Sequence, residues 1–308
     1  MTFHWSVAQA RIYQLWSVGL HGKAYPVGET GIRECFRDQG LIQLDPLPVL
    51  GRNHDLVIQA HVDGTHPGET LDLIHRKRLG FEYWDKMLCC LPIEYFPDYR
   101  AFMTSGGDAW TAKHEARLKK EHPGALDAVY QAVGQHGPVS SRELKALKVA
   151  QEDHRGWKST KAANACLEVL WNRGMVSVSH RINYRRYFDL TERVIPAQFR
   201  EAASPSLDSF WRTMLRRRVR AVGLLPVRSN AEAWAFLQRV RRNQLPEKLV
   251  REEALSLVRV DGIKLPFYAL PHAEKELALA EETALDDKVR FIAPLDPLVW
   301  ARNALLLL

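Results

Sequence analysis

The sequence is poor in cysteine, and its cysteines have no metal-binding or redox spacing. Four occur in 308 residues, at Cys35, Cys89, Cys90 and Cys166. No C-x-x-C motif joins any two of them, and so few cysteines in a chain of this length do not make a disulfide scaffold. We expect four reduced, buried side chains that pack as small apolar residues, and no thiolate zinc site.

Long hydrophobic runs and nucleotide-binding motifs are also missing from the sequence. No apolar stretch approaches the roughly 20 residues that a membrane helix needs, and the N-terminus lacks the basic and apolar regions of a signal peptide. The sequence contains no P-loop, no dinucleotide fingerprint and no nucleophile elbow. With 46% hydrophobic and 26% charged residues, its composition is that of a globular protein. We therefore expect a cytoplasmic protein without a membrane partner.

Acidic residues are scarce in the middle of the chain. Residues 141–250 hold 22 Lys and Arg against 10 Asp and Glu, whereas the rest of the chain holds 21 against 26. A basic middle favours a polyanionic partner, most simply nucleic acid. An ordinary basic surface that aids solubility explains the same numbers, so charge alone leaves both interpretations open.

Residues 125–190 follow the element order of a winged helix-turn-helix domain. One helix is predicted at 125–133, and a second follows the capping-box residues Ser140 and Glu143. A third begins at Ser159 and ends before Gly174. The alternating sequence MVSVSHRINYRRYFDL then predicts a β-hairpin. The alternative is a helical bundle with a hairpin cover and a basic solvated face.

A winged-helix domain binds DNA through its third helix, which enters a groove, and through its hairpin wing, which lies along the backbone. The predicted DNA-binding residues are therefore three at the start of that helix and three on the wing: Ser159, Thr160, Lys161, Arg181, Arg185 and Arg186.

The same order of elements occurs twice more, with weaker signals. In the N-terminal copy, helices are predicted at 6–20, 30–39 and 68–78. The C-terminal copy spans residues 205–278, with a hairpin turn at Asp261-Gly262. We expect a mainly α, α+β fold of tandem winged-helix domains in a curved array. The predicted domains are 1–124, which carries the segment described next, then 125–195 and 196–308.

One short segment, Gln43-Leu44-Asp45-Pro46, could carry chemistry. Proline disfavours the helical region for the residue before it, so Asp45 should be extended. In extended chain Gln43 and Asp45 point to one face and Leu44 points to the other, into a core. An amide beside a carboxylate can hold a water between them. The carboxylate can deprotonate that water or stabilise a developing cation. A surface strand with an Asp-Pro turn explains the triplet equally well.

A cluster of acidic and imidazole side chains follows this segment. It consists of His54, Asp55, His61, Asp63, His66 and Glu69. The number of ligands would suffice for a metal, but their spacing matches no zinc pattern. We therefore predict no metal and no cofactor.

At LIQLDPLPVLGRNHDLVIQAHV the sequence resembles the YcaQ/AlkZ-type bacterial DNA glycosylases. Gln43 and Asp45 match the family's Gln-apolar-Asp catalytic motif, and Arg52 and His54 match the arginine-x-histidine signature that follows it. Further matches are the helix after HPGE, the stretches around Glu82 and Glu94, and the late FIAPLDPLVW. Asp45, in place of a second Gln, resembles the broader-specificity YcaQ branch.

The resemblance implies a tandem winged-helix enzyme of DNA repair that excises bulky alkylated purines and unhooks interstrand crosslinks. Gln43 would orient a water and Asp45 would activate it, while Arg52 and His54 would bind DNA. No lysine nucleophile is implied, so the enzyme would leave an abasic site without cutting the strand. The implied partner is double-stranded DNA with alkylated or crosslinked purines, bound by a monomer at the nucleoid. A crosslinked base cannot flip into a closed pocket, and an open concave site would avoid that demand.

Members of the family usually continue beyond the LDPLVW stretch into a β-rich C-terminal region. Because this sequence ends at Leu308, we expect it to contain only the start of that region.

Two other functions fit parts of the sequence. A non-catalytic winged-helix DNA-binding protein, such as a transcription regulator, would explain the basic middle and the hairpins, and would prefer one DNA sequence. A small-molecule hydrolase that uses the His/Asp cluster would bind metal and be sensitive to chelators.

Overall fold

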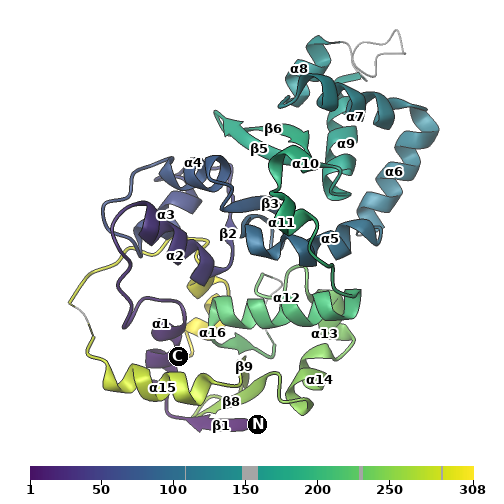
Figure 1. The fold of residues 1–308 in the computed structure, drawn as a ribbon. Helices are drawn as coiled ribbons and strands as arrows, with labels where there is room; N and C mark the ends of the chain where they lie inside the picture. Colours follow the sequence, from purple (N-terminus) through teal and green to yellow (C-terminus); the bar gives the residue numbers. More distant parts are fainter. Residues whose placement is uncertain (108, 148–158, 229–231, 286) are drawn as a thin grey trace. The chain divides into compact units, whose positions relative to one another are not determined.

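The computed structural model describes residues 1–107, 109–147, 159–228, 232–285 and 287–308, apart from the side chains of 159–161 and 303. The chain is α+β and mainly helical, as predicted (Figure 1). It forms two compact units. The first comprises residues 1–71, 84–92 and 211–308, and the second comprises 72–83 and 93–210. The division into three domains stays a prediction.

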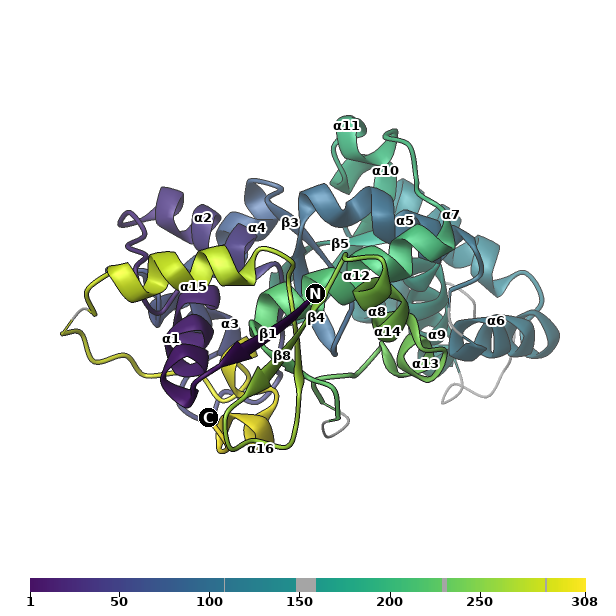
Figure 2. The same cartoon turned by 90° about the horizontal axis from the view of Figure 1, so that it is seen from below.

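The first unit is built around a four-stranded sheet in the order β1-β8-β9-β7. Its strands are β1 (Thr2–Trp5), β7 (Leu225–Pro226), β8 (Ser256–Val260) and β9 (Phe267–Ala269). β1 pairs in parallel with β8, so the start of the chain lies beside a segment some 250 residues later (Figure 2). The helices of this unit are α1 (Val7–Ser17), α2 (Glu29–Gln39), α3 (Asn53–Gln59), α13 (Gln238–Arg242), α14 (Leu245–Arg251), α15 (Ala273–Glu282), η2 (Pro297–Val299) and α16 (Arg302–Leu305).

A short antiparallel pair in the same unit carries the Gln-x-Asp segment. β2 (Ile42–Gln43) pairs with β4 (Leu88–Pro92), with Ile42 opposite Cys90 and Gln43 opposite Cys89. β2 begins shortly after α2, which ends at Gly40 because that residue adopts the left-handed conformation, with φ 70°. All four cysteines are free and buried, as predicted.

The second unit contains the predicted winged-helix order. Its elements are β3 (Gly80–Trp84), η1 (Ile93–Tyr95), α5 (Phe96–Thr104), α6 (Ala109–Glu121), α7 (Ala125–His136), α8 (Ser141–Ala146), α9 (Ser159–Asn172), β5 (Val176–Ile182), β6 (Arg185–Leu190), α10 (Thr191–Val194) and α11 (Ala197–Arg200). The capping box of α8 forms as predicted, because the Glu143 carboxylate accepts a hydrogen bond from the Ser140 amide at 2.7 Å. β5 and β6 pair as an antiparallel hairpin beside α7 and α9 (Figure 1).

The N-terminal helices agree with the predicted ranges, and several elements were not foreseen. The chain passes between the units four times: within α4 (Glu69–Arg76), within β3, between β4 and η1, and within α12 (Leu207–Val222). α3, α5 and α6 were not predicted. The hairpin predicted at Asp261-Gly262 has a longer loop, since β8 ends at Val260 and β9 begins at Phe267.

Among the described residues, no helix combines the length and the apolar character that crossing a membrane requires.

Candidate active site

Hydrogen bonds hold the backbone around Gln43, at the end of β2. The Gln43 carbonyl oxygen accepts a hydrogen bond from Asn53 Nδ2 at 2.8 Å. The next amide, of Leu44, donates to Leu88 O at 2.8 Å, and the Leu44 side chain is 4% exposed. Leu44 therefore points into the core, as predicted. The backbone around Gln43 is thus held by Asn53 and by the pairing with β4.

The Gln43 side chain is buried and contacts a lysine that the sequence analysis did not single out. Lys86 Nζ donates to Gln43 Oε1 at 3.1 Å, and both side chains are buried. An ammonium group can only donate, so the amide atom that faces it must be the oxygen. The NH2 end of Gln43 is therefore the end that is left for another group.

Asp45 lies two residues beyond Gln43 and is half-buried. Its Oδ1 accepts a hydrogen bond from the Leu47 amide at 2.7 Å, which forms an Asx turn after Pro46. Arg52 Nη1 donates to the Pro46 carbonyl at 2.7 Å and so closes the loop from the other side. The arrangement leaves the carboxylate beside a fixed turn at the surface.

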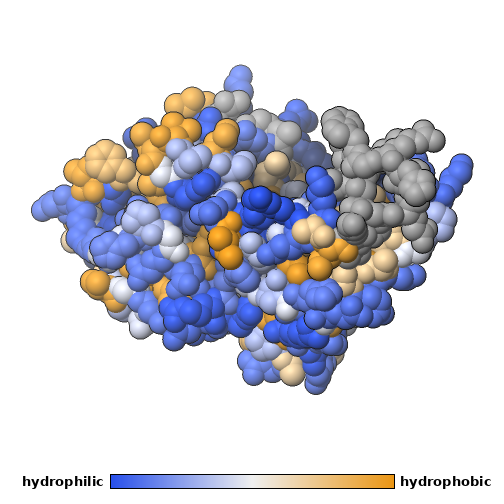
Figure 3. Space-filling model, turned by 90° about the horizontal axis from the view of Figure 1, so that it is seen from above, coloured by the Kyte–Doolittle hydropathy of each residue, from blue (hydrophilic) through white to orange (hydrophobic). Residues whose placement is uncertain are grey.

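The loop that follows Asp45 exposes three apolar side chains. Leu47, Val49 and Leu50 are 71%, 86% and 92% exposed. The face of the molecule drawn in Figure 3 is mostly hydrophilic, with hydrophobic residues in separate groups. Apolar side chains exposed to this degree next to one another are unusual on a protein surface and mark contact sites.

His54 and Asp55 lie inside the first unit. His54 is 1% exposed, with Nε2 3.7 Å from Asp55 Oδ2. The Gly68 amide donates to Asp55 Oδ2 at 2.8 Å. Burial raises the pKa of the Asp55 carboxyl, against hydrogen bonds from Gly68 and Thr70 that lower it. These contacts tie α3 to the start of α4. DNA binding by Arg52 and His54 stays a prediction.

The other members of the His/Asp cluster lie in separate places. His61 is buried and contacts Gln39 Nε2 at 3.1 Å, while exposed Asp63 pairs with Lys288 at 2.7 Å. The backbone amide of His66 donates to Glu69 at 3.0 Å, at the start of α4. In the part of the chain that the structure describes, no three His, Cys, Asp or Glu side chains are grouped as metal ligands.

The three wing arginines differ in their surroundings. Arg181 forms an ion pair with buried Glu82, with Nη2 2.6 Å from Oε2. Arg186 pairs with Glu168 and lies over the Trp171 ring, with its guanidinium carbon 5.1 Å from the ring centre. Arg185 is exposed. Of the three, Arg185 presents its side chain to solvent most openly.

The remaining predicted DNA-binding residues are at the start of α9. The helix begins at Ser159 as predicted. The side chains of Ser159, Thr160 and Lys161 lie outside the described part of the structure, so their roles stay predictions.

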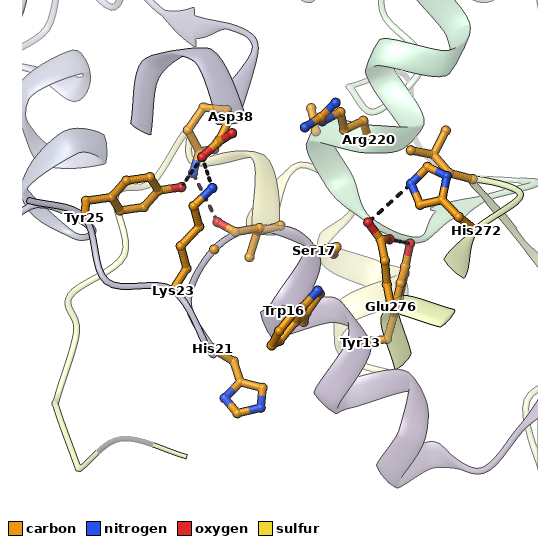
Figure 4. A pocket seen from close by; sticks show the side chains of 16 residues that line it. Tyr13, Trp16, Ser17, His21, Lys23, Tyr25, Asp38, Arg220, His272 and Glu276 are labelled. Atoms are coloured by element: carbon orange, nitrogen blue, oxygen red, sulfur yellow. Dashed lines mark hydrogen bonds and ion pairs between the residues drawn. The ribbon is translucent and has the colours of Figure 1, made fainter. Parts of the chain in front are cut away.

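A cavity of about 400 Å³ lies elsewhere in the first unit, between α1, α2, α12 and α15. On one side Lys23 and Tyr25 bind Asp38, and on the other His272 binds Glu276 at 3.2 Å (Figure 4). Acidic side chains thus bind Lys23 and His272 in this cavity, which Arg220 also lines, and we assign the cavity no part in the chemistry.

Comparison with known proteins identifies the family. The profile of the family described as DNA glycosylase AlkZ-like matches residues 36–308, most of the chain. The chain belongs to the AlkZ-like DNA glycosylases. The matched region includes β2, the Asp45 turn, the wing and the segment up to Trp300.

A solved structure of an AlkZ-like enzyme has the same fold. The DNA glycosylase AlkZ of Streptomyces sahachiroi matches with a TM-score of 0.62 and 17% sequence identity. The match covers 91% of this chain and 73% of that chain. Family membership places the chain in the DNA glycosylase class, which acts in DNA repair, and the solved structure shows a shared fold.

The site residue that sequence reasoning missed in this AlkZ-like chain is Lys86. It follows the EYW stretch by one residue and sits 43 positions from Gln43. A lysine that is 5% exposed is rare in proteins. Its contact with Gln43 depends on the β2–β4 pairing, which no local pattern predicted.

Proposed function

We propose that this protein is a monofunctional DNA glycosylase that hydrolyses the N-glycosidic bond of N7-alkylated purines and unhooks interstrand crosslinks. Gln43 positions the attacking water and Asp45 activates it. The observation that carries the proposal is the pairing at the end of β2. The Gln43 amide is fixed through Oε1 with its NH2 end left open, and a half-buried carboxylate lies two residues away.

The chemistry needs little from the protein. An N7-alkylated guanine carries a positive charge, so it leaves as a neutral base when the C1′–N9 bond breaks and takes the electron pair. The sugar becomes an oxocarbenium ion, which the Asp45 carboxylate stabilises. Water then adds to C1′ and loses its proton to Asp45, which produces an abasic site. The strand stays intact.

The orientation of Gln43 fits this role. Its NH2 group can donate to one lone pair of the water, while a water O–H donates to Asp45. The second lone pair is then available to attack C1′. A Gln43 amide turned the other way would accept the second water O–H instead of donating to the water oxygen.

The partner is double-stranded DNA that contains alkylated or crosslinked purines, bound by a monomer at the bacterial nucleoid. Exposed Arg185 on the wing supports phosphate contact. Binding through such contacts is independent of sequence and weakens with salt.

The test is excision from duplex DNA that carries N7-methylguanine or, separately, a nitrogen-mustard crosslink, followed by alkaline cleavage of abasic sites. Asp45→Asn is the sharp variant, because an asparagine oxygen can still accept from the Leu47 amide and keep the turn. We expect Asp45→Asn and Gln43→Ala to lower single-turnover excision by roughly 100-fold or more, the scale of losing a positioned acid–base group.

The matched control is Asp63→Asn, which removes an exposed carboxylate from the same unit and should leave excision unchanged. Absence of abasic product from the wild-type protein, together with tight binding to one DNA sequence, would favour a non-catalytic DNA-binding protein instead. Loss of excision in Asp63→Asn would show that the variants act through general destabilisation.

A further inference from the structure

Lys86 is enclosed in the first unit at the back of the candidate active site. Its ammonium is 3.1 Å from Gln43 Oε1 and 4.9 Å from the centre of the Trp300 ring. Trp300 is 1% exposed and ends the FIAPLDPLVW stretch. The lysine thus joins the catalytic strand to a segment 250 residues further along the chain.

The acidic group nearest in sequence is already engaged. Asp85 forms a buried ion pair with Arg218, whose guanidinium carbon also lies 5.4 Å from the centre of the Trp300 ring. Arg218 Nη1 donates in addition to the Ala233 carbonyl at 2.6 Å. Asp85 is thus paired with Arg218, and Glu232 is the acidic residue that acts electrostatically on Lys86. The hydrogen bond of the Lys86 ammonium goes to the Gln43 amide, and the ammonium also lies over the tryptophan ring.

We propose that Lys86 is a positioning residue for catalysis, which holds the Gln43 amide with its NH2 end toward the attacking water. This inference rests on the proposed function. A carboxamide on a flexible side chain can turn by 180° at little cost, and only its surroundings decide which end faces the substrate. An ammonium group can only donate hydrogen bonds, so it holds the amide oxygen toward itself and turns the NH2 end away.

Two further observations support this role. Burial lowers the pKa of the Lys86 ammonium; Glu232 and Cys89 act against this shift, and Arg218 and Arg302 act with it. A more acidic ammonium is a stronger hydrogen-bond donor. A donor bound to the amide oxygen also polarises the amide and strengthens its N–H groups as donors.

The test is a double-mutant cycle between Lys86 and Gln43, measured as single-turnover excision of N7-methylguanine at saturating enzyme. Lys86→Met keeps the length of the side chain and removes the donor. We expect it to lower the rate by about tenfold to a hundredfold, the scale of a hydrogen bond to a charged group. Lys86→Arg, which keeps a donor, should recover most of the rate. DNA affinity should stay unchanged in both.

The effect must depend on Gln43. In the Gln43→Ala background, Lys86→Met should change the rate less than twofold, because there is no amide left to hold. An equal loss in both backgrounds, or a wild-type rate in Lys86→Met, would overturn the proposal. So would a borohydride-trapped covalent complex with DNA that Lys86→Met abolishes, since that would make the amine a nucleophile. The control is Lys288→Met, which removes an exposed lysine of the same unit and should leave the rate unchanged.

A readout without catalysis separates this proposal from the proposed function. In protein with ¹⁵N-labelled glutamine side chains, the signal lost in Gln43→Ala identifies the Gln43 NH2 group. We expect Lys86→Met to shift that signal and speed its exchange with water, and Lys86→Arg to restore it. If wild-type protein excises no base, the proposed function fails, and an unchanged Gln43 signal in Lys86→Met overturns the positioning role by itself.

Discussion

Arg181 on the wing and Glu82 on β3, 99 residues apart, form a two-point ion pair. Arg181 Nε lies 2.7 Å from Glu82 Oε1 and Nη2 lies 2.6 Å from Oε2. His75 Nε2 contacts the same carboxylate at 3.1 Å. Arg181 Nη1 also donates to the Tyr184 carbonyl at 2.8 Å, within the turn of the hairpin. Both partners belong to the second unit, so the pair fixes the wing to the strand that precedes it.

The first prediction is that Arg181 contributes to stability through this pair. Arg181→Met would leave the Glu82 carboxylate buried without its main partner, so we expect a loss of about 3–5 kcal/mol in the free energy of unfolding. Urea unfolding monitored by circular dichroism measures it. The double variant Arg181→Met with Glu82→Met removes both charges and should recover most of the loss. A stable Arg181→Met variant with weakened DNA binding would instead support the phosphate contact predicted for Arg181 from the sequence.

The second prediction concerns acid. Burial alone would raise the pKa of Glu82, but hydrogen bonds and charges from Arg181 and His75 lower it from 4.5 to about 2. A carboxyl with a lowered pKa in the folded state stabilises the fold fully above its unfolded pKa. That stability is lost as pH falls from about 4.5 toward about 2, and it amounts to about 3 kcal/mol. Unfolding free energies measured between pH 6 and pH 2.5 should show this slope, and Glu82→Gln should flatten it.

The winged-helix order of the second unit was predictable because its signals are local. The capping box at Ser140 and Glu143, the stop at Gly174 and the alternation across β5 and β6 each operate within a few residues. α5 and α6 were not predicted, because proline-punctuated and highly charged stretches give weak periodicity. β1 was not predicted either, since its pairing with β8 joins opposite ends of the chain and nothing near Thr2–Trp5 indicates a partner.

In the candidate site, too, local features were predictable from the sequence and contacts between distant segments were not. The extended Gln43–Asp45 segment and the inward side chain of Leu44 follow from Pro46 and the alternation of a strand. The contacts of Lys86 with Gln43 and of Arg181 with Glu82 could not be predicted, because each joins segments that only the folded chain brings together. From the sequence alone, a lysine or arginine in a basic region can equally well bind DNA phosphate or pair with a buried carboxylate. Only its burial in the folded chain decides between the two.

The third prediction is that Arg185 contacts DNA phosphate. Arg185→Ala should weaken binding to undamaged duplexes of any sequence by a similar factor, and lower the slope of log affinity against log salt by about 1. Because the side chain is exposed, the unfolding free energy should change by less than about 0.5 kcal/mol. Fluorescence anisotropy at several salt concentrations measures the slope. Arg200→Ala serves as control, because it alters a partly exposed arginine of the same unit that pairs with Glu201. An unaltered slope in Arg185→Ala would contradict the prediction.

The fourth prediction is that the apolar loop after Asp45 contacts the bases at the lesion. We expect the triple variant Leu47→Ser, Val49→Ser and Leu50→Ser to fold with an unchanged melting temperature, because the three side chains are 71–92% exposed and bury little surface. Its affinity for DNA with an N7-alkylated purine should fall, since apolar side chains beside the Asp45 carboxylate can insert at an unstacked base step. Apolar contacts release no counterions, so this loss should be the same at low and high salt, unlike that of Arg185→Ala.

The control for the loop is Val27→Ser, a substitution at a side chain that is 71% exposed in the same unit but outside the loop. It should leave both stability and lesion binding unchanged. Binding measured on damaged and undamaged duplexes at two salt concentrations separates the outcomes. Equal losses on damaged and undamaged DNA would place the loop on the backbone, and an unchanged affinity on both would leave it without a role in DNA recognition.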